Sequence, residues 1–165
     1  NRREALLKKV EQVLARTPAR KAYYPGAQQR YQGFLDKYPQ ARALGPKGEG
    51  VVPWTLIPGV PAEKGEYALT NEAFCGVIAD VALEAADARA FLEAATKFAN
   101  DACWGTLSMQ LLIDPQTEKT YKAELDRAIA ELRYGGIAIN CWAAVLYGLG
   151  VTTWGACKPE SSVCT

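Results

Sequence analysis

A carboxylate, an aromatic ring and a thiol lie within four residues in the stretch TNEAFCGVIADVAL, residues 70–83. Glu72 and Cys75 could act as base and nucleophile. Glu72 could equally hold a diol, because an ionised carboxylate only accepts hydrogen bonds. Phe74 and the apolar run that begins at Val77 are instead typical of the start of a buried strand. The spacing leaves three alternatives: a reactive thiol, a ligand-holding carboxylate, or a solvated carboxylate ahead of a strand.

Histidine is absent from the sequence. A Ser-His-Asp triad, a Cys-His pair and most catalytic zinc sites are therefore excluded within this chain. The five cysteines form no C-x2-C pair, which disfavours metal binding, and no G-x-G-x-x-G or G-x4-G-K-[ST] stretch is present to cradle a phosphate. Cys75, Cys103 and Cys141 adjoin apolar residues, where desolvation raises the pKa of a thiol. A structural role is favoured for each of the three.

Length and charge indicate one ordinary globular domain. The chain has 165 residues, 49% of them hydrophobic, with 19 Lys plus Arg against 18 Asp plus Glu. This balance provides no basic face for a nucleic acid or an anionic membrane, and no apolar run is long enough to span a bilayer. The odd, irregularly spaced cysteines indicate a reducing compartment, so we expect a cytoplasmic protein. Because the sequence opens on Asn1 and not on Met, we expect its true beginning to lie upstream.

Two amphipathic helices are expected in the first part of the chain. Residues 2–16 place Leu6, Val10, Val13 and Leu14 at helical spacing. Residues 25–38 carry an aromatic and apolar stripe that is typical of a core, made by Tyr31, Phe34, Leu35 and Tyr38. Residues 39–66 are expected to form irregular surface structure around one extended piece, VVPWTLI, which Pro53 places at a sheet edge.

From residue 77 the hydrophobic pattern predicts strand, helix, strand, helix, strand. The strands are expected in GVIADVAL, GTLSMQLLI and GGIAIN, and the helices over 87–99 and 117–133, capped by Asp87 and Thr117. The inward faces of the helices are expected to carry Phe91, Ala95 and Phe98 in the first, and Tyr121, Leu125, Ala128, Ile129 and Leu132 in the second. A βαβαβ order predicts an α/β fold, a layered sheet with parallel strands and sites near their carboxyl ends.

Four stretches in this order resemble motifs of the aldehyde dehydrogenase superfamily. NEAFCGVIADVAL is similar to its E-x-F-G-P-V stretch, WGTLSMQLLI to its Y-G-L strand, LRYGGIAINCW to G-x-v-x-v-N, and TTWGACKPESS to P-F-G-G-x-K-x-S-G. The resemblance covers roughly residues 70–162. It implies that residues 1–165 are a partial catalytic domain, without the cofactor domain and without the segment that carries the nucleophile.

The resemblance also implies roles for individual residues. Glu72 matches the glutamate that holds the nicotinamide ribose hydroxyls, and Phe74 the aromatic residue beside the nicotinamide of NAD or NADP. Asn140 matches the asparagine at the end of a sheet strand. Trp154 stands where the family has an aromatic residue near the aldehyde pocket, and Trp142 joins it with less support. Lys158 and Ser161 echo the K-x-S portion and are assigned only a structural role.

Departures from the motifs limit what this chain can do alone. Cys75 and Gly76 replace the motif glycine and proline, so Cys75 does not stand at the nucleophile's position, and neither G-Q-x-C nor E-L-G-G-K is present. The implied activity is oxidation of a small-molecule aldehyde to a carboxylic acid in a longer enzyme, with an inactive fragment here. The resemblance leaves room for a homo-oligomer. The alternatives are a stand-alone, non-catalytic α/β binding or scaffolding domain, and a thiol enzyme that uses Cys75.

Overall fold

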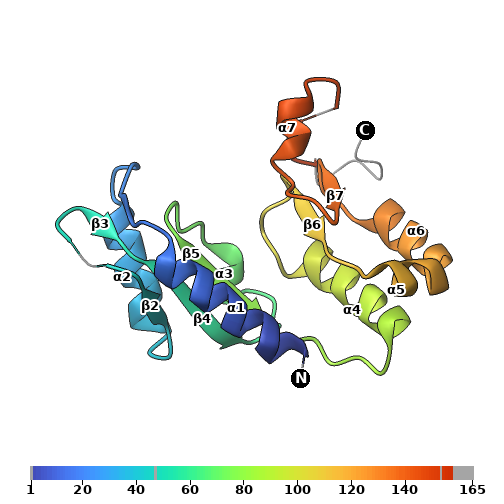
Figure 1. Cartoon of the computed structure of the whole chain (residues 1–165), viewed down its shortest axis with the longest axis horizontal. Coiled ribbons are helices and arrows are strands. Elements are labelled where there is room, and N and C mark those ends of the chain that lie inside the picture. Colours follow the sequence, from blue (N-terminus) through green and yellow to red (C-terminus); the bar gives the residue numbers. More distant parts are fainter. Residues whose placement is uncertain (1, 47, 153, 158–165) are drawn as a thin grey trace. The chain divides into compact units, whose positions relative to one another are not determined.

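The computed structural model describes residues 2–46, 48–152 and 154–157 (Figure 1). The chain forms two compact units, which meet in sequence between Ala82 and Leu83, while the short stretch Ala62–Gly65 groups with the second unit. In the described part of the chain, no helix is long and apolar enough to cross a membrane.

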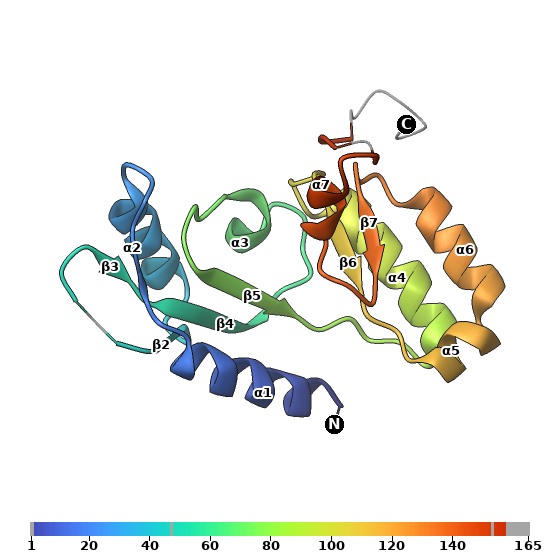
Figure 2. The ribbon, with the colours of Figure 1, turned by 45° about the horizontal axis from the view of Figure 1, so that its top comes forward.

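The first unit is a small mixed sheet with helices. Its elements are α1 (Arg2–Arg16), β1 (Arg20–Lys21), α2 (Ala27–Lys37), β2 (Arg42–Leu44), β3 (Val51–Val52), β4 (Trp54–Val60), α3 (Tyr67–Thr70) and β5 (Val77–Val81). The strand order is β2-β4-β5, with β4 antiparallel to β2 and parallel to β5, and β1 pairs separately with β3. Helices α2 and α3 lie on one side of β4 and β5, and α1 lies on the other (Figure 2).

The core of the first unit joins α2 to β4. Phe34 and Tyr38 are buried against Ile57 and Val60, as the aromatic stripe of residues 25–38 predicts. Tyr67 of α3 covers Phe34, with ring centroids 5.0 Å apart. Helix α1 has no fully buried residue, and the predicted face is wrong at Leu6 and Val13, which are exposed. Ion pairs from Arg3 and Glu11 contribute to holding this helix against the sheet.

β4 corrects the expectation that VVPWTLI lies at a sheet edge within irregular structure. Pro53 precedes β4 and takes no place in its ladder, so the strand can be central, and Leu56 and Ile57 are completely buried. The proline within this strand, Pro58, coincides with a shift of register between Ile57 and Val60. A proline is tolerated there because a bulge needs no regular ladder bond.

The second unit is a parallel strand pair with helices packed against it. Its elements are α4 (Ala88–Asp101), β6 (Met109–Leu111), α5 (Pro115–Thr120), α6 (Lys122–Glu131), β7 (Ile137–Ile139) and α7 (Val145–Leu149). β6 and β7 pair in parallel through α5 and α6, which confirms the second half of the predicted βαβαβ order. The first half is wrong as part of one sheet, because among the described residues β5 pairs in parallel with β4 and not with β6. Two clusters form the core, Leu92 with Leu125 and Ala128, and Ala99 with Leu132 and Tyr134.

Three details of the predicted helices are wrong. The buried residues of α4 are Leu92, Thr96 and Ala99, while Phe91 is 48% exposed, because the side of α4 that meets α6 is one position away from the phenylalanine stripe. The cap after β6 is Asp114, not Thr117: its carboxylate accepts from the Thr117 amide, and the predicted single helix is divided at Tyr121. The predicted cap Asp87 is confirmed by its bond from the Ala90 amide.

Candidate functional site

Glu72 lies in the turn between α3 and β5. Its carboxylate is exposed, and among the residues that the structure describes it has no hydrogen-bond or ion-pair partner. Two residues later, Phe74 holds a left-handed backbone with φ of 48° and is 50% exposed. For an aromatic residue this conformation costs roughly 1–3 kcal/mol, so the surrounding contacts must hold it in place.

Arg30 and Tyr24 are the contacts that hold Phe74. The Arg30 guanidinium lies over the Phe74 ring, with its central carbon 5.2 Å from the centroid, and its Nε donates to the carbonyl of Ala73 at 3.2 Å. Tyr24 packs against Phe74 at 5.2 Å between centroids, and Tyr23 stands edge-on to Tyr24 at 5.1 Å. The result is an exposed aromatic surface with one fixed positive charge.

Cys75 is a half-buried free thiol behind this surface. Burial raises the pKa of Cys75, and the nearby positive charge of Arg30 offsets the rise only in part. The thiol is therefore mainly protonated near neutral pH, which makes it a poor nucleophile. The next residue, Gly76, lies against the Trp54 ring, so the Cys75-Gly76 pair fits the start of a tightly packed strand.

Asn140 ends β7 and ties it to the neighbouring strand. Its backbone is left-handed, with φ of 54°, and its amide donates to the Leu111 carbonyl at 2.9 Å. Its side-chain oxygen accepts from the Ile113 amide, also at 2.9 Å. Asn140 thus fixes the carboxyl ends of β6 and β7, which is where a parallel sheet commonly places its sites.

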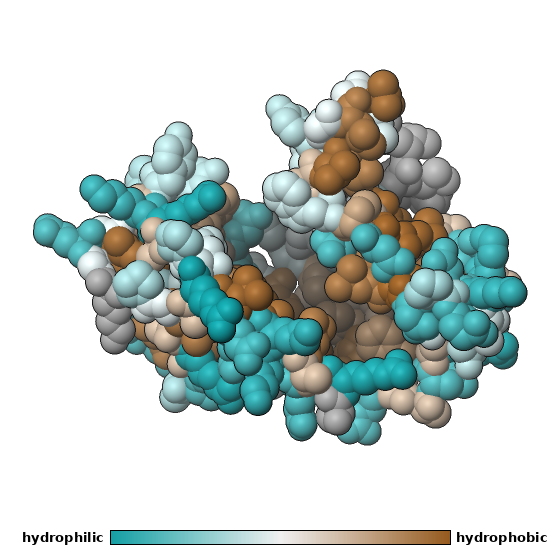
Figure 3. Space-filling view, in the orientation of Figure 1, coloured by the Kyte–Doolittle hydropathy of each residue, from teal (hydrophilic) through white to brown (hydrophobic). Residues whose placement is uncertain are grey.

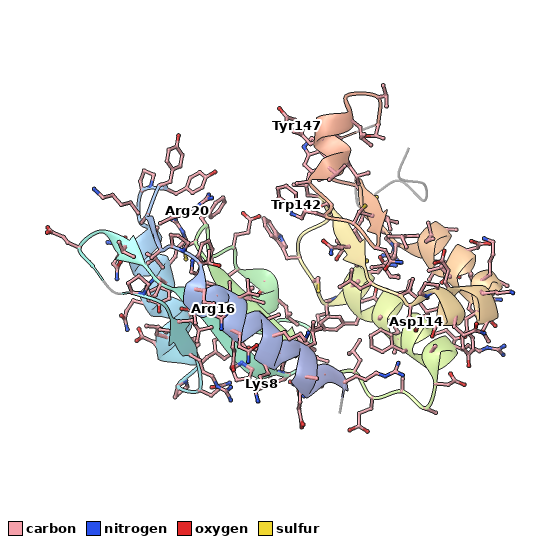
Figure 4. All side chains as sticks on the ribbon, viewed as in Figure 1. Lys8, Arg16, Arg20, Asp114, Trp142 and Tyr147 are labelled. Carbon is pink, nitrogen blue, oxygen red and sulfur yellow. The ribbon has the colours of Figure 1, made fainter. Side chains whose placement is uncertain are left out.

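The two predicted tryptophans lie beyond this strand end, beside α7. Trp142 is 71% and Trp154 41% exposed, and Trp154 packs edge-on against Tyr147 with centroids 5.5 Å apart. Figure 4 labels Trp142 and Tyr147, the first just before α7 and the second on it. No aromatic contact joins Trp142 to Trp154 within the described part of the chain.

Part of the surface over α7 is apolar, as the brown patch in Figure 3 shows. Its exposed residues are Trp142, Val145, Tyr147, Leu149, Val151 and Trp154. Thr106 binds the segment that follows Trp154 through hydrogen bonds. Its carbonyl accepts from the amides of Gly135 and Cys157, and its hydroxyl donates to the Cys157 carbonyl at 3.1 Å. Lys158 and Ser161 lie outside the described residues.

The predicted residues fall into two groups. Glu72 and Phe74 belong to the first unit, and Trp142 and Trp154 to the second. Arg30 and Tyr24 were missed from the sequence, because they lie more than forty positions before Phe74 and match none of the quoted motifs. The exposed carboxylate of Glu72 and the half-exposed ring of Phe74 fit a nicotinamide riboside, which presents vicinal hydroxyls and a planar ring. In the described part of the chain, no three potential ligand side chains gather as a metal would need.

Comparison with known proteins gives a likeness of fold. No protein-family model matches the sequence, and no curated protein matches it. Among solved structures, the chain is similar to the NADP-dependent glyceraldehyde-3-phosphate dehydrogenase of Bacillus halodurans C-125, solved in complex with NADP, with a TM-score of 0.64 and 13% identity. The match covers 84% of this chain and 29% of that enzyme's chain, so the present chain corresponds to a fragment of a dehydrogenase-like α/β fold.

Proposed function

We propose that residues 1–165 are part of the catalytic domain of an aldehyde dehydrogenase-like oxidoreductase that uses NAD or NADP. The observation that carries this proposal is the likeness of fold to an NADP-dependent dehydrogenase over 84% of the chain. The order of the four motif-like stretches supports it independently. In the proposed reaction, an aldehyde, water and the oxidised cofactor give a carboxylic acid, the reduced cofactor and a proton.

In this proposal Glu72 and Phe74 form one wall of the nicotinamide site. The bound cofactor supplies the hydride acceptor. The Glu72 carboxylate accepts hydrogen bonds from the ribose hydroxyls, and the Phe74 ring lies beside the nicotinamide. Because the left-handed backbone of Phe74 is held by Arg30 and Tyr24, the ring is ordered before the cofactor arrives, which lowers the entropic cost of positioning.

Trp154 and Trp142 would border the aldehyde pocket. Trp154 packs edge-on against Tyr147, and the segment that follows it is fixed by the hydrogen bond between Thr106 and Cys157. Trp142 is the more exposed of the two tryptophans. Cys75 does not supply the nucleophile, since its thiol is half-buried and its pKa is raised. We therefore expect this chain alone to be inactive, and we keep a cytoplasmic location and a homo-oligomeric full-length protein as parts of the proposal.

The test is a matched pair of glutamate variants in the full-length protein. Glu72→Gln removes the charge from the residue that is proposed to bind the ribose. Glu63→Gln removes the charge from another exposed glutamate. We expect Glu72→Gln to lower the rate of hydride transfer or the cofactor affinity about tenfold, with an unchanged melting temperature. Glu63→Gln should match the wild type in both.

Unchanged steady-state and single-turnover kinetics in Glu72→Gln would overturn the assignment of Glu72. A full-length protein that binds no nicotinamide cofactor and oxidises no aldehyde would favour the non-catalytic α/β binding or scaffolding domain instead.

A further inference from the structure

The positive charge of Arg30 is fixed with respect to the Phe74 ring. Its guanidinium is anchored twice, by the hydrogen bond from Nε to the Ala73 carbonyl and by the cation–π contact with the ring. Both anchors belong to the same two-residue segment, so Arg30 and Phe74 keep their relation when that segment moves. Tyr24 adds a third contact, on the ring itself.

These contacts leave half of the Phe74 ring exposed. The guanidinium carbon of Arg30 lies 5.2 Å from the centroid of the ring against which a planar ligand ring would pack. At such a distance, near a protein surface, two unit charges still interact measurably, although salt weakens the effect. The charge of the ligand ring therefore affects its binding at this site.

The nicotinamide ring changes its charge when it accepts hydride. The oxidised ring is a pyridinium cation, whereas the reduced dihydropyridine is neutral, and the ribose and phosphate are the same in both. A fixed cation beside the ring opposes the oxidised form and leaves the reduced form unaffected. The hydrogen bonds of Glu72 to the ribose hydroxyls are the same in both forms, whereas its negative charge attracts the oxidised ring and so opposes the effect of Arg30.

We propose that Arg30 is a specificity-determining residue that shifts the preference of the Phe74 surface towards reduced nicotinamide. This inference rests on the proposed function, because it needs Phe74 to contact the nicotinamide. It adds a residue of α2 to the site, and it predicts that the Arg30 charge favours retention of the reduced cofactor.

The experiment measures the dissociation constants of oxidised and reduced nicotinamide mononucleotide for the full-length protein, by NMR shifts of the residue 72–76 amides. The quantity compared is the ratio of the oxidised to the reduced constant. Arg30→Met should lower this ratio roughly two- to fivefold at low salt, and Arg30→Lys should keep most of it, because the lysine retains the charge. Lys37→Met, at the far end of the same helix, is the matched control and should leave the ratio unchanged.

Each other outcome has a separate meaning. If neither mononucleotide shifts these amides, the cofactor contact and the role of Arg30 both fail. If both bind and Arg30→Met keeps the wild-type ratio, the role of Arg30 is overturned while the cofactor contact stands. If Arg30→Lys behaves like Arg30→Met, or Lys37→Met changes the ratio equally, a local charge at position 30 is not the cause and the inference is likewise overturned.

Discussion

The guanidinium of Arg3 on α1 forms a two-point ion pair with the carboxylate of Asp80 on β5. Nε donates to one carboxylate oxygen at 3.0 Å and a terminal nitrogen donates to the other, while the Gly59 amide donates to the same carboxylate at 3.1 Å. Since α1 has no fully buried residue, this contact and the ion pair between Glu11 and Arg42 are the polar ties between the helix and the sheet. A helix held in this way depends on the charge of its partners.

The stability of the first unit should therefore fall in acid. Burial alone would raise the pKa of Asp80, but the hydrogen bonds from Arg3 and Gly59, with the charge of Arg3, outweigh burial and lower the pKa. The stabilisation is complete above the pKa of an unfolded aspartate, about 4, and is lost as the pH falls through the lower folded value. We expect Asp80→Asn to melt about 5 °C or less below the wild type at pH 6, with the difference shrinking as the pH falls below the pKa of an unfolded aspartate.

Thermal melts from pH 6 to pH 2 would measure this, with Asp36→Asn as the control. Asp36 is an exposed aspartate whose hydrogen bond comes from Gln32, within its own helix. A difference between wild type and Asp80→Asn that stays constant over this range would show that the charge of Asp80 does not hold α1.

Gly76 should not tolerate alanine. A Cβ atom there would lie 2.3 Å from Cε3 of Trp54, and the indole is itself held by a hydrogen bond to the Pro18 carbonyl. Moving the ring would disturb the start of β4, so we expect a loss of about 1–3 kcal/mol in the free energy of unfolding by urea. Gly48→Ala is the matched control, because its Cβ would meet Val51 at an ordinary 3.5 Å. Equal urea midpoints for the two variants would contradict this account of the turn.

Local patterns in the sequence predicted which helices and strands form better than they predicted which face of each element is buried. The cap at Asp87 and the parallel βαβ unit follow from neighbouring residues and from the handedness of the crossover, so both could be foreseen. The inward face of α4 could not, because Phe91 and Leu92 are equally apolar and only the position of α6 decides between them. The left-handed backbone of Phe74 could not be foreseen either, because no local pattern marks it and its contact with Arg30 joins residues 44 positions apart.

Gly135 should be the most sensitive glycine of the second unit. Its Cβ would lie 1.5 Å from the carbonyl oxygen of Gly155, a backbone atom that cannot rotate away. We expect Gly135→Ala to displace the segment that carries Trp154 and to cost about 1–3 kcal/mol of stability. Fluorotryptophan NMR would follow the Trp154 resonance, with Gly148→Ala as control, since a Cβ there meets nothing within 4 Å. An unshifted Trp154 resonance in Gly135→Ala would show that the contact between Gly135 and Gly155 does not position Trp154.

Thiol labelling tests the reactive-thiol reading of the 72–75 stretch. Burial raises the pKa of both Cys75 and Cys103, whereas Cys141 is an exposed free thiol. Because the thiolate is the reacting form, we expect Cys141 to be alkylated first near neutral pH and Cys75 several-fold more slowly, as located by mass spectrometry. Arg30→Met should slow Cys75 further, since it removes the one nearby charge that lowers its pKa, and Lys37→Met should not. Rapid alkylation of Cys75 in the wild type would instead favour a thiol enzyme, and it would move the chemistry of this turn from Glu72 and Phe74 to the cysteine beside them.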